Sequence, residues 1–262
     1  MSTRNPAAVD PQSGYQAGSQ AGPLEPTSPV TEDWTPRAMK FKMIRRLMLT
    51  DWYFHRRVLL AYIGGGAVSL ALVAWGGEVG FYAGFVLFVT VLIGLGIHLP
   101  FSTVVEERKQ QTLTFVMSLP ISITEYTAAK LLSNLLLFLF PWLTLLACTA
   151  TVIASREGMP NGLIPFATLL LVEIFAGSCL ILGTALVSES IAWTVGAMIF
   201  SNLFFHAFLY TVAHLPGIAE RLEGQSAAWS STEILVLVGE LAVIGLILGS
   251  TFVLQARKTD FL

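Results

Sequence analysis

The sequence predicts an all-α, polytopic membrane protein with six transmembrane helices, and three observations support this. First, the chain is 54% hydrophobic and 12% charged, with a mean hydropathy of +0.69, whereas soluble domains carry roughly 25% charged residues. Second, it contains apolar runs of about 20 residues, long enough as helices to cross a hydrocarbon core of about 30 Å. Third, backbone amides in lipid must be hydrogen-bonded within the protein, and these runs lack the alternation of barrel strands, so they are predicted to be helices.

Six apolar stretches meet these criteria, and each is separated from the next by polar or turn-forming residues. They are residues 58–75, 80–100, 131–153, 162–187, 191–213 and 234–254. Because six is an even number, the two termini are predicted to lie on the same side of the membrane.

The basic residues predict which side that is. Thirteen of the fifteen Lys and Arg residues precede the first span, lie between the second and third, or follow the last; only Arg156 and Arg221 fall in the opposite loops. Positively charged loops are retained in the cytoplasm, so both termini are predicted to be cytoplasmic. We expect a multi-pass protein of a cell membrane, the bacterial inner membrane, with the lipid bilayer as a partner and no nucleic acid.

Two segments precede the first span. Residues 1–36 are rich in Pro, Gly and Ser and have few large aliphatic side chains, which predicts a disordered cytoplasmic tail. Between about 38 and 56, apolar residues recur at helical spacing among basic ones, which is typical of a helix lying in the membrane interface. The alternative is a cytoplasmic extension of the first span. The apolar residues are Phe41, Ile44, Met48 and Trp52.

The cytoplasmic segment between the second and third spans carries the clearest functional pattern. A charged cluster, EERK at 106–109, is followed by the apolar residues Leu113, Phe115, Val116 and Leu119, and Pro120 ends the pattern. This pattern predicts a short amphipathic helix that offers an apolar face to a groove on another protein. The alternative is a solvated loop followed by a simple stop before the next span.

The stretch EERKQQTL, then SLPIS, then Lys130 resembles the permease subunits of ABC transporters of the type 2 exporter group. The opening MIRRLMLTDWYFHRRVLL and the closing QARKTDFL resemble the same family, so the likeness covers residues 37–262 as a six-span permease domain. It implies that the cytoplasmic segment forms a coupling helix that docks into a separate ATP-binding subunit. The implied contact residues are Glu106, Glu107, Arg108, Thr112, Leu119 and Pro120.

The resemblance also implies a division of labour. The chain contains no G-x-x-x-x-G-K-[ST] phosphate-binding loop, so it is expected to have no ATPase activity and to bind no cofactor itself. ATP and Mg would be held by the partner subunit. A second copy of this chain, or a sister permease, would complete a dimer that exports an unidentified substrate.

Two carboxyl groups are predicted within the membrane. Glu173 and Glu240 lie inside apolar spans, where an ionised carboxylate costs about 2.5–3.5 kcal/mol on insertion scales. They are therefore expected to face protein or water. They would either line a substrate pathway or make protonated or paired packing contacts between helices.

Histidines suggest a different function, a membrane-embedded metal or haem enzyme or anchor subunit. His98, His206 and His214, with Glu173, would supply the ligands. His206 and His214 are eight residues apart, which places them roughly 80° apart around a helix and about 12 Å along its axis. That spacing does not favour one metal bound by both.

Overall fold

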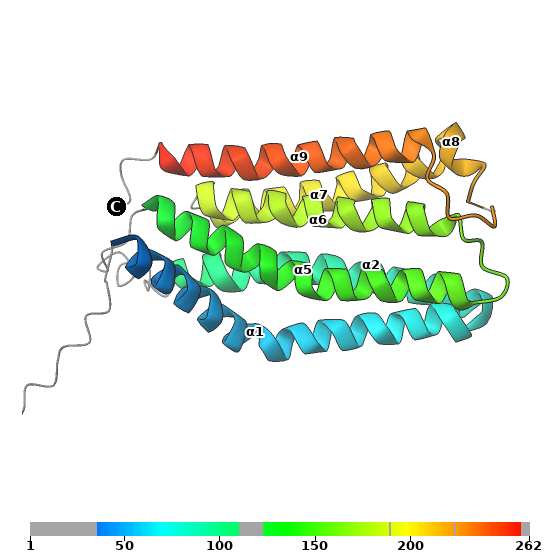
Figure 1. Cartoon of the computed structure of the whole chain (residues 1–262), viewed down its shortest axis with the longest axis horizontal. Coiled ribbons are helices and arrows are strands. Elements are labelled where there is room, and N and C mark those ends of the chain that lie inside the picture. The colour runs from blue at the N-terminus through cyan, green and yellow to red at the C-terminus, as the bar shows by residue number, and fades with distance from the viewer. Residues whose placement is uncertain (1–35, 110–122, 189, 223, 258–262) are drawn as a thin grey trace, which may run out of the picture.

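The computed structural model describes residues 36–109, 123–188, 190–222 and 224–257. Within this part of the chain all regular structure is helical, which confirms the all-α fold. Six long helices lie side by side in a bundle (Figure 1), and each is long and apolar enough to cross a membrane. They are α1 (Pro36–Trp75), α2 (Gly77–Pro100), α5 (Ile123–Ser155), α6 (Leu163–Ser188), α7 (Ile191–Ala213) and α9 (Ser231–Ala256).

Three short elements lie at the two ends of the bundle. The π-helical turn η1 (Phe101–Val105) and α3 (Glu106–Lys109) continue from α2, and α8 (Pro216–Ala219) comes after α7. The beginning of α1 and the end of α9 lie at one end of the bundle (Figure 1), as an even number of spans requires. We call this the inner end, after the predicted sidedness, and the end that carries α8 the outer end.

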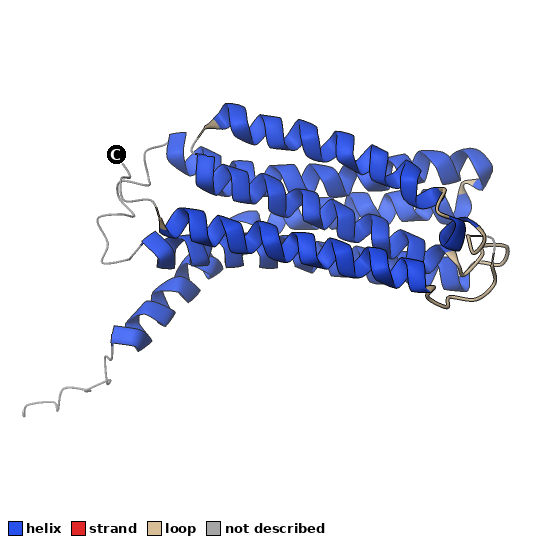
Figure 2. Ribbon diagram, turned by 90° about the horizontal axis from the view of Figure 1, so that it is seen from above, coloured by secondary structure: helices blue, strands red, loops and turns tan. Residues whose placement is uncertain are grey.

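Helix α1 joins the 38–56 segment to the first span. It runs from Pro36 to Trp75, and Figure 1 shows its first part set at an angle to the rest. Figure 2 shows the beginning of α1 projecting away from the bundle. The helix ends at the Gly76–Gly77 turn, where Gly77 has a φ of +63°, a conformation that a side chain would strain.

Helix α6 is the centre of the bundle. It packs against α2, α5, α7 and α9, and 72% of its most apolar window is buried, against 11–39% for the other five spans. Small residues allow this close approach, because hydroxyl side chains sit where a glycine leaves room. The pairs are Ser178 against Gly96, Ser201 against Gly177 and Thr251 against Gly183.

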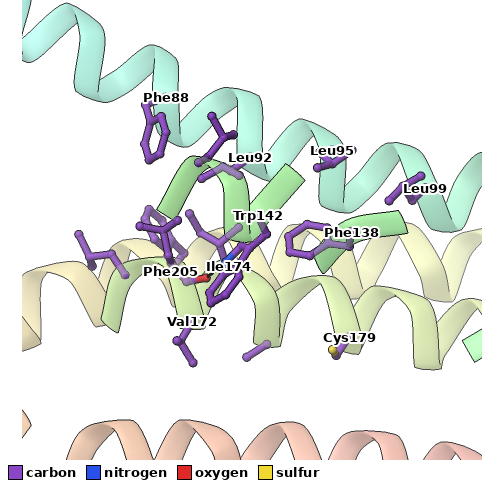
Figure 3. Packing of buried hydrophobic residues seen from close by; sticks show 14 of the residues in the cluster. Phe88, Leu92, Leu95, Leu99, Phe138, Trp142, Val172, Ile174, Cys179 and Phe205 are labelled. Atoms are coloured by element: carbon purple, nitrogen blue, oxygen red, sulfur yellow. Dashed lines mark hydrogen bonds between the residues drawn. The ribbon is translucent and has the colours of Figure 1, made fainter. Parts of the chain in front are cut away.

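The largest apolar cluster of the described residues contains side chains from all six long helices, most of them from α2, α5 and α6 (Figure 3). Phe88 and Leu92 of α2 belong to this cluster with Phe138 and Trp142 of α5, and the indole nitrogen of Trp142 donates a hydrogen bond to the carbonyl of Leu171, 2.8 Å away. The bonded indole removes the cost of burying its polar N–H. Large apolar side chains on α7 and α9 point outward instead, as lipid-facing surfaces do.

Candidate functional site

The inner end of α5 carries a buried lysine that binds two carboxylates from different helices. The Nζ of Lys130 lies 2.5 Å from Oε1 of Glu107 in α3 and 3.3 Å from Oδ2 of Asp51 in α1. Lys130 is 4% exposed. One ammonium group therefore joins three elements that are far apart in the sequence.

Both carboxylates have a second partner. The hydroxyl of Ser133 donates to Oδ2 of Asp51 at 2.8 Å, and that of Tyr126 donates to Oε2 of Glu107 at 3.3 Å. Buried charges are tolerated when they are both paired and hydrogen-bonded. Tyr126, Lys130 and Ser133 succeed one another at i, i+4 and i+7, which places them on one face of α5. We call Asp51, Glu107, Tyr126, Lys130 and Ser133 the inner ion cluster.

The helix that delivers Glu107 changes its geometry just before the cluster. Pro100 has no N–H to give to the α-helical ladder, and it is succeeded by η1, in which the N–H of Glu106 bonds to the carbonyl of Phe101 five residues earlier. A π-helical turn inserts an extra residue and rotates the chain beyond it, and such turns are frequent at functional sites. Here the turn sets the direction in which α3 leaves the bundle.

The π-helical turn is fastened to α5 by a buried hydrogen bond. The hydroxyl of Thr103 lies 2.7 Å from the carbonyl of Leu99 and 2.9 Å from Oδ1 of Asn134, so its single hydrogen is shared between these acceptors. The side-chain nitrogen of Asn134 donates to the carbonyl of Lys130 at 3.0 Å. The turn is thus connected to the residue that carries the central charge of the cluster.

A second connection joins the turn to α1. The Nε2 of His55 lies 3.0 Å from the hydroxyl oxygen of Ser102, and its Nδ1 lies 2.8 Å from the carbonyl of Asp51. The ring of His98 is 6.4 Å from that of His55, in an edge-on arrangement. Polar side chains therefore tie α1, η1, α3 and α5 together at the inner end.

The predicted contact residues divide into two groups. Glu107 lies at the centre of the cluster, and Glu106 is exposed next to it. Thr112, Leu119 and Pro120, like the side chain of Arg108, lie outside the described residues. The pattern singled out Lys130 but missed Asp51. One feature of the sequence does distinguish Asp51: it is the only acidic residue between 37 and 77, in a strongly basic stretch.

The two membrane carboxyl groups lie elsewhere. Glu173 of α6 and Glu240 of α9 are both buried, with 7% and 6% of their surface exposed, so they face the protein interior rather than lipid. Neither is a member of the inner ion cluster. They lie on two helices that pack against each other.

The three predicted histidines do not come together. His206 lies on α7 and His214 directly follows its last residue; both are exposed, and each has Nδ1 near the carbonyl four residues earlier. His98 lies near the inner end of α2. Among the described residues, no three His, Cys, Asp or Glu side chains are grouped so that they could hold a metal ion.

No family model, curated protein or solved structure matches the chain. The resemblance of the EERKQQTL and SLPIS segments to exporter permeases therefore stays a prediction from the sequence. The structure adds the six-helix arrangement and the inner ion cluster.

Proposed function

We propose that this chain is the membrane-spanning permease subunit of an ATP-driven ABC exporter, with ATP and Mg bound by a separate subunit. One observation carries the proposal: Lys130, at the end of the segment that resembles the coupling helix, forms ion pairs with the beginning of that segment and with α1. Glu107 lies at its beginning, Tyr126 and Lys130 at its end, and Asp51 beside them.

This arrangement supports a mechanical role. When a partner moves residues 110–122, the displacement reaches α2 through Glu107 and η1, and α5 through Tyr126 and Lys130. It reaches α1 through Asp51. Separating a buried ion pair leaves a charge uncompensated. The helices that the ion pairs connect therefore move together rather than apart. The cluster thus transmits motion to three membrane spans at once.

The roles of the predicted contact residues depend on their positions. Glu107 is paired with Lys130 and held by Tyr126, so it positions the segment. Glu106 is exposed beside it and faces the proposed partner. Thr112, Leu119 and Pro120 supply the rest of the proposed contact. The functional unit contains two permease chains, identical or related, in a bacterial inner membrane with cytoplasmic termini.

The experiment is affinity purification of the full chain from native membranes in mild detergent, with identification of the co-purifying proteins. We expect a P-loop ATPase with the wild-type chain, and its loss with Glu107→Lys and with Leu119→Asp. Glu157→Lys is the matched control, because it makes the same charge change at an exposed position at the outer end. It should retain the ATPase.

Two results would contradict the proposal. One is a wild-type preparation that never contains a P-loop ATPase in several detergents. The other is equal retention of the ATPase by Glu107→Lys, Leu119→Asp and the control. An absorbance spectrum and a metal analysis of the same wild-type preparation test the metal or haem alternative, which requires a stoichiometric metal.

A further inference from the structure

A second polar site lies in the membrane interior, where α6 meets α7 and α9. Glu173 lies on α6 and Glu240 on α9, two helices that pack against each other. Both side chains are more than nine-tenths buried. Neither carboxyl group belongs to the inner ion cluster.

A small polar cavity adjoins Glu173. Its volume is about 20 Å³, and its polar lining is Glu173 and Ser178 of α6 with Ser201 and Asn202 of α7. About 10–15 Å³ is enough for one water molecule when polar partners are present. The side-chain nitrogen of Asn202, which also lines the cavity, donates to the carbonyl of Met198 at 2.9 Å, so its side-chain oxygen is the acceptor that this bond does not use.

Two side chains at this site lack the partners that buried polar groups require. The hydroxyl of Ser178, a residue 9% exposed, has no hydrogen-bond partner among the described residues, and it lines the cavity. Both carboxyl oxygens of Glu240 likewise have no partner there. An ionised carboxylate is costly without donors or a cation, whereas the neutral acid is far less so.

The charged groups of the surrounding helices do not compensate the pair. Those on the helices packed around α6 and α9 are engaged or turned away: Lys130 binds Asp51 and Glu107, Glu233 accepts the N–H of Ser230 at the outer end of α9, His98 lies against His55, and His206 is exposed. Protonation neutralises a carboxylate without the several oxygen ligands that a hard metal cation needs.

We propose that Glu173 and Glu240 are two proton-binding carboxyl groups in the membrane interior. Glu240 is held as a neutral carboxylic acid, and Glu173 exchanges a proton with one water molecule in the adjoining cavity, which Ser178 and Asn202 also bond. Loss of a proton puts negative charge into the interface of α6 with α9 and weakens the packing there. The proposal does not depend on the permease assignment.

Carbodiimide labelling tests it directly, because a hydrophobic carbodiimide adds to a protonated carboxyl group in apolar surroundings. The full-length protein, in lipid vesicles, is treated with dicyclohexylcarbodiimide in mildly acidic and mildly alkaline buffer, and the adducts are located by peptide mass spectrometry. We expect adducts on Glu240 and Glu173, with the adduct on Glu173 declining as pH rises. Glu233 is the internal control, because its bonded carboxylate should stay unlabelled.

Variants and a second measurement complete the test. Glu240→Gln and Glu173→Gln should each lose their own adduct, while His206→Gln should label as wild type does. In mildly alkaline buffer, where Glu173 has lost its proton, the infrared band of a protonated carboxyl group should disappear in Glu240→Gln and persist in Glu233→Gln. Absence of both adducts and of the band would overturn the proposal. Protection by sodium ions at constant pH would also overturn it, because the site would then bind a metal cation. Neither result involves an ATPase, so this test can fail while the proposed function stands.

Discussion

The ammonium group of Lys130 lies 2.5 Å from the carboxylate of Glu107, so a side chain of α5 holds in place the four-residue helix that comes after η1. The same ammonium binds Asp51 of α1, whose side chain is only 13% exposed. Glu107 is more accessible, at 29%. The Asp51 pair is therefore the part of the inner ion cluster that matters more for stability, and the Glu107 pair is the part that water can reach.

Replacing Lys130 by Met should destabilise the protein by about 3 kcal/mol, near the lower end of the range for breaking a buried ion pair, because Asp51 is left without its cation. The measurement is thermal or denaturant unfolding of the purified chain in detergent. Lys109→Met is the matched control: Lys109 is exposed, and exposed substitutions usually stay within about 0.5 kcal/mol. Equal stability of the two variants would show that the cluster contributes nothing measurable to the fold.

Thr103→Val should weaken the attachment of η1 to α5, because Oδ1 of Asn134 loses its hydroxyl partner inside the protein. An orphaned buried acceptor costs about 1–3 kcal/mol. Hydrogen exchange should rise across residues 99–109. Thr90→Val makes the same change at an exposed position of α2, where the hydroxyl bonds only to its own helix, and should leave exchange unaltered. Faster exchange in both variants alike would argue against a specific role of the Thr103 bond.

Gly96→Ala should destabilise the contact between α2 and α6, because the added Cβ would overlap the hydroxyl oxygen of Ser178. Overpacking of this kind costs about 1–3 kcal/mol. The double variant Gly96→Ala with Ser178→Ala should recover most of the loss, since the clashing oxygen is removed. Gly64→Ala is the control, with no atom within 4 Å of its new Cβ, and should be neutral or slightly stabilising. If the double variant does not recover stability, the hydroxyl of Ser178 is not the group that the added Cβ overlaps.

The six spans could be predicted because length and apolar character are local properties of the sequence. The position of each span in the bundle could not. The spans Gly77–Val105 and Leu163–Ser188 have the same mean hydropathy, 2.2, yet 28% of one window and 72% of the other are buried. Lipid tails and the protein interior are about equally apolar, so hydropathy alone cannot identify α6 as the central helix.

The candidate site was predictable only in part, for a similar reason. Glu107 and Lys130 stand in one recognisable stretch of sequence, 23 residues apart. Asp51 is 79 residues from Lys130, and only the packing of α1 against α5 brings the two together. The sequence left open whether Glu173 and Glu240 pair with other groups; the structure places both in the interior and leaves the oxygens of Glu240 without a partner among the described residues.

The sidedness of the bundle can be tested with two introduced cysteines. Lys109→Cys places a thiol on α3 at the inner end, and Glu157→Cys places one in the exposed turn after α5 at the outer end. Both are made in a chain whose Cys148 and Cys179 are replaced by Ala. The positive-inside rule predicts that a membrane-impermeant maleimide labels Glu157→Cys on intact cells, and Lys109→Cys only after permeabilisation. The opposite pattern would put α3 outside, away from cytoplasmic ATP, and the permease proposal would fall with it.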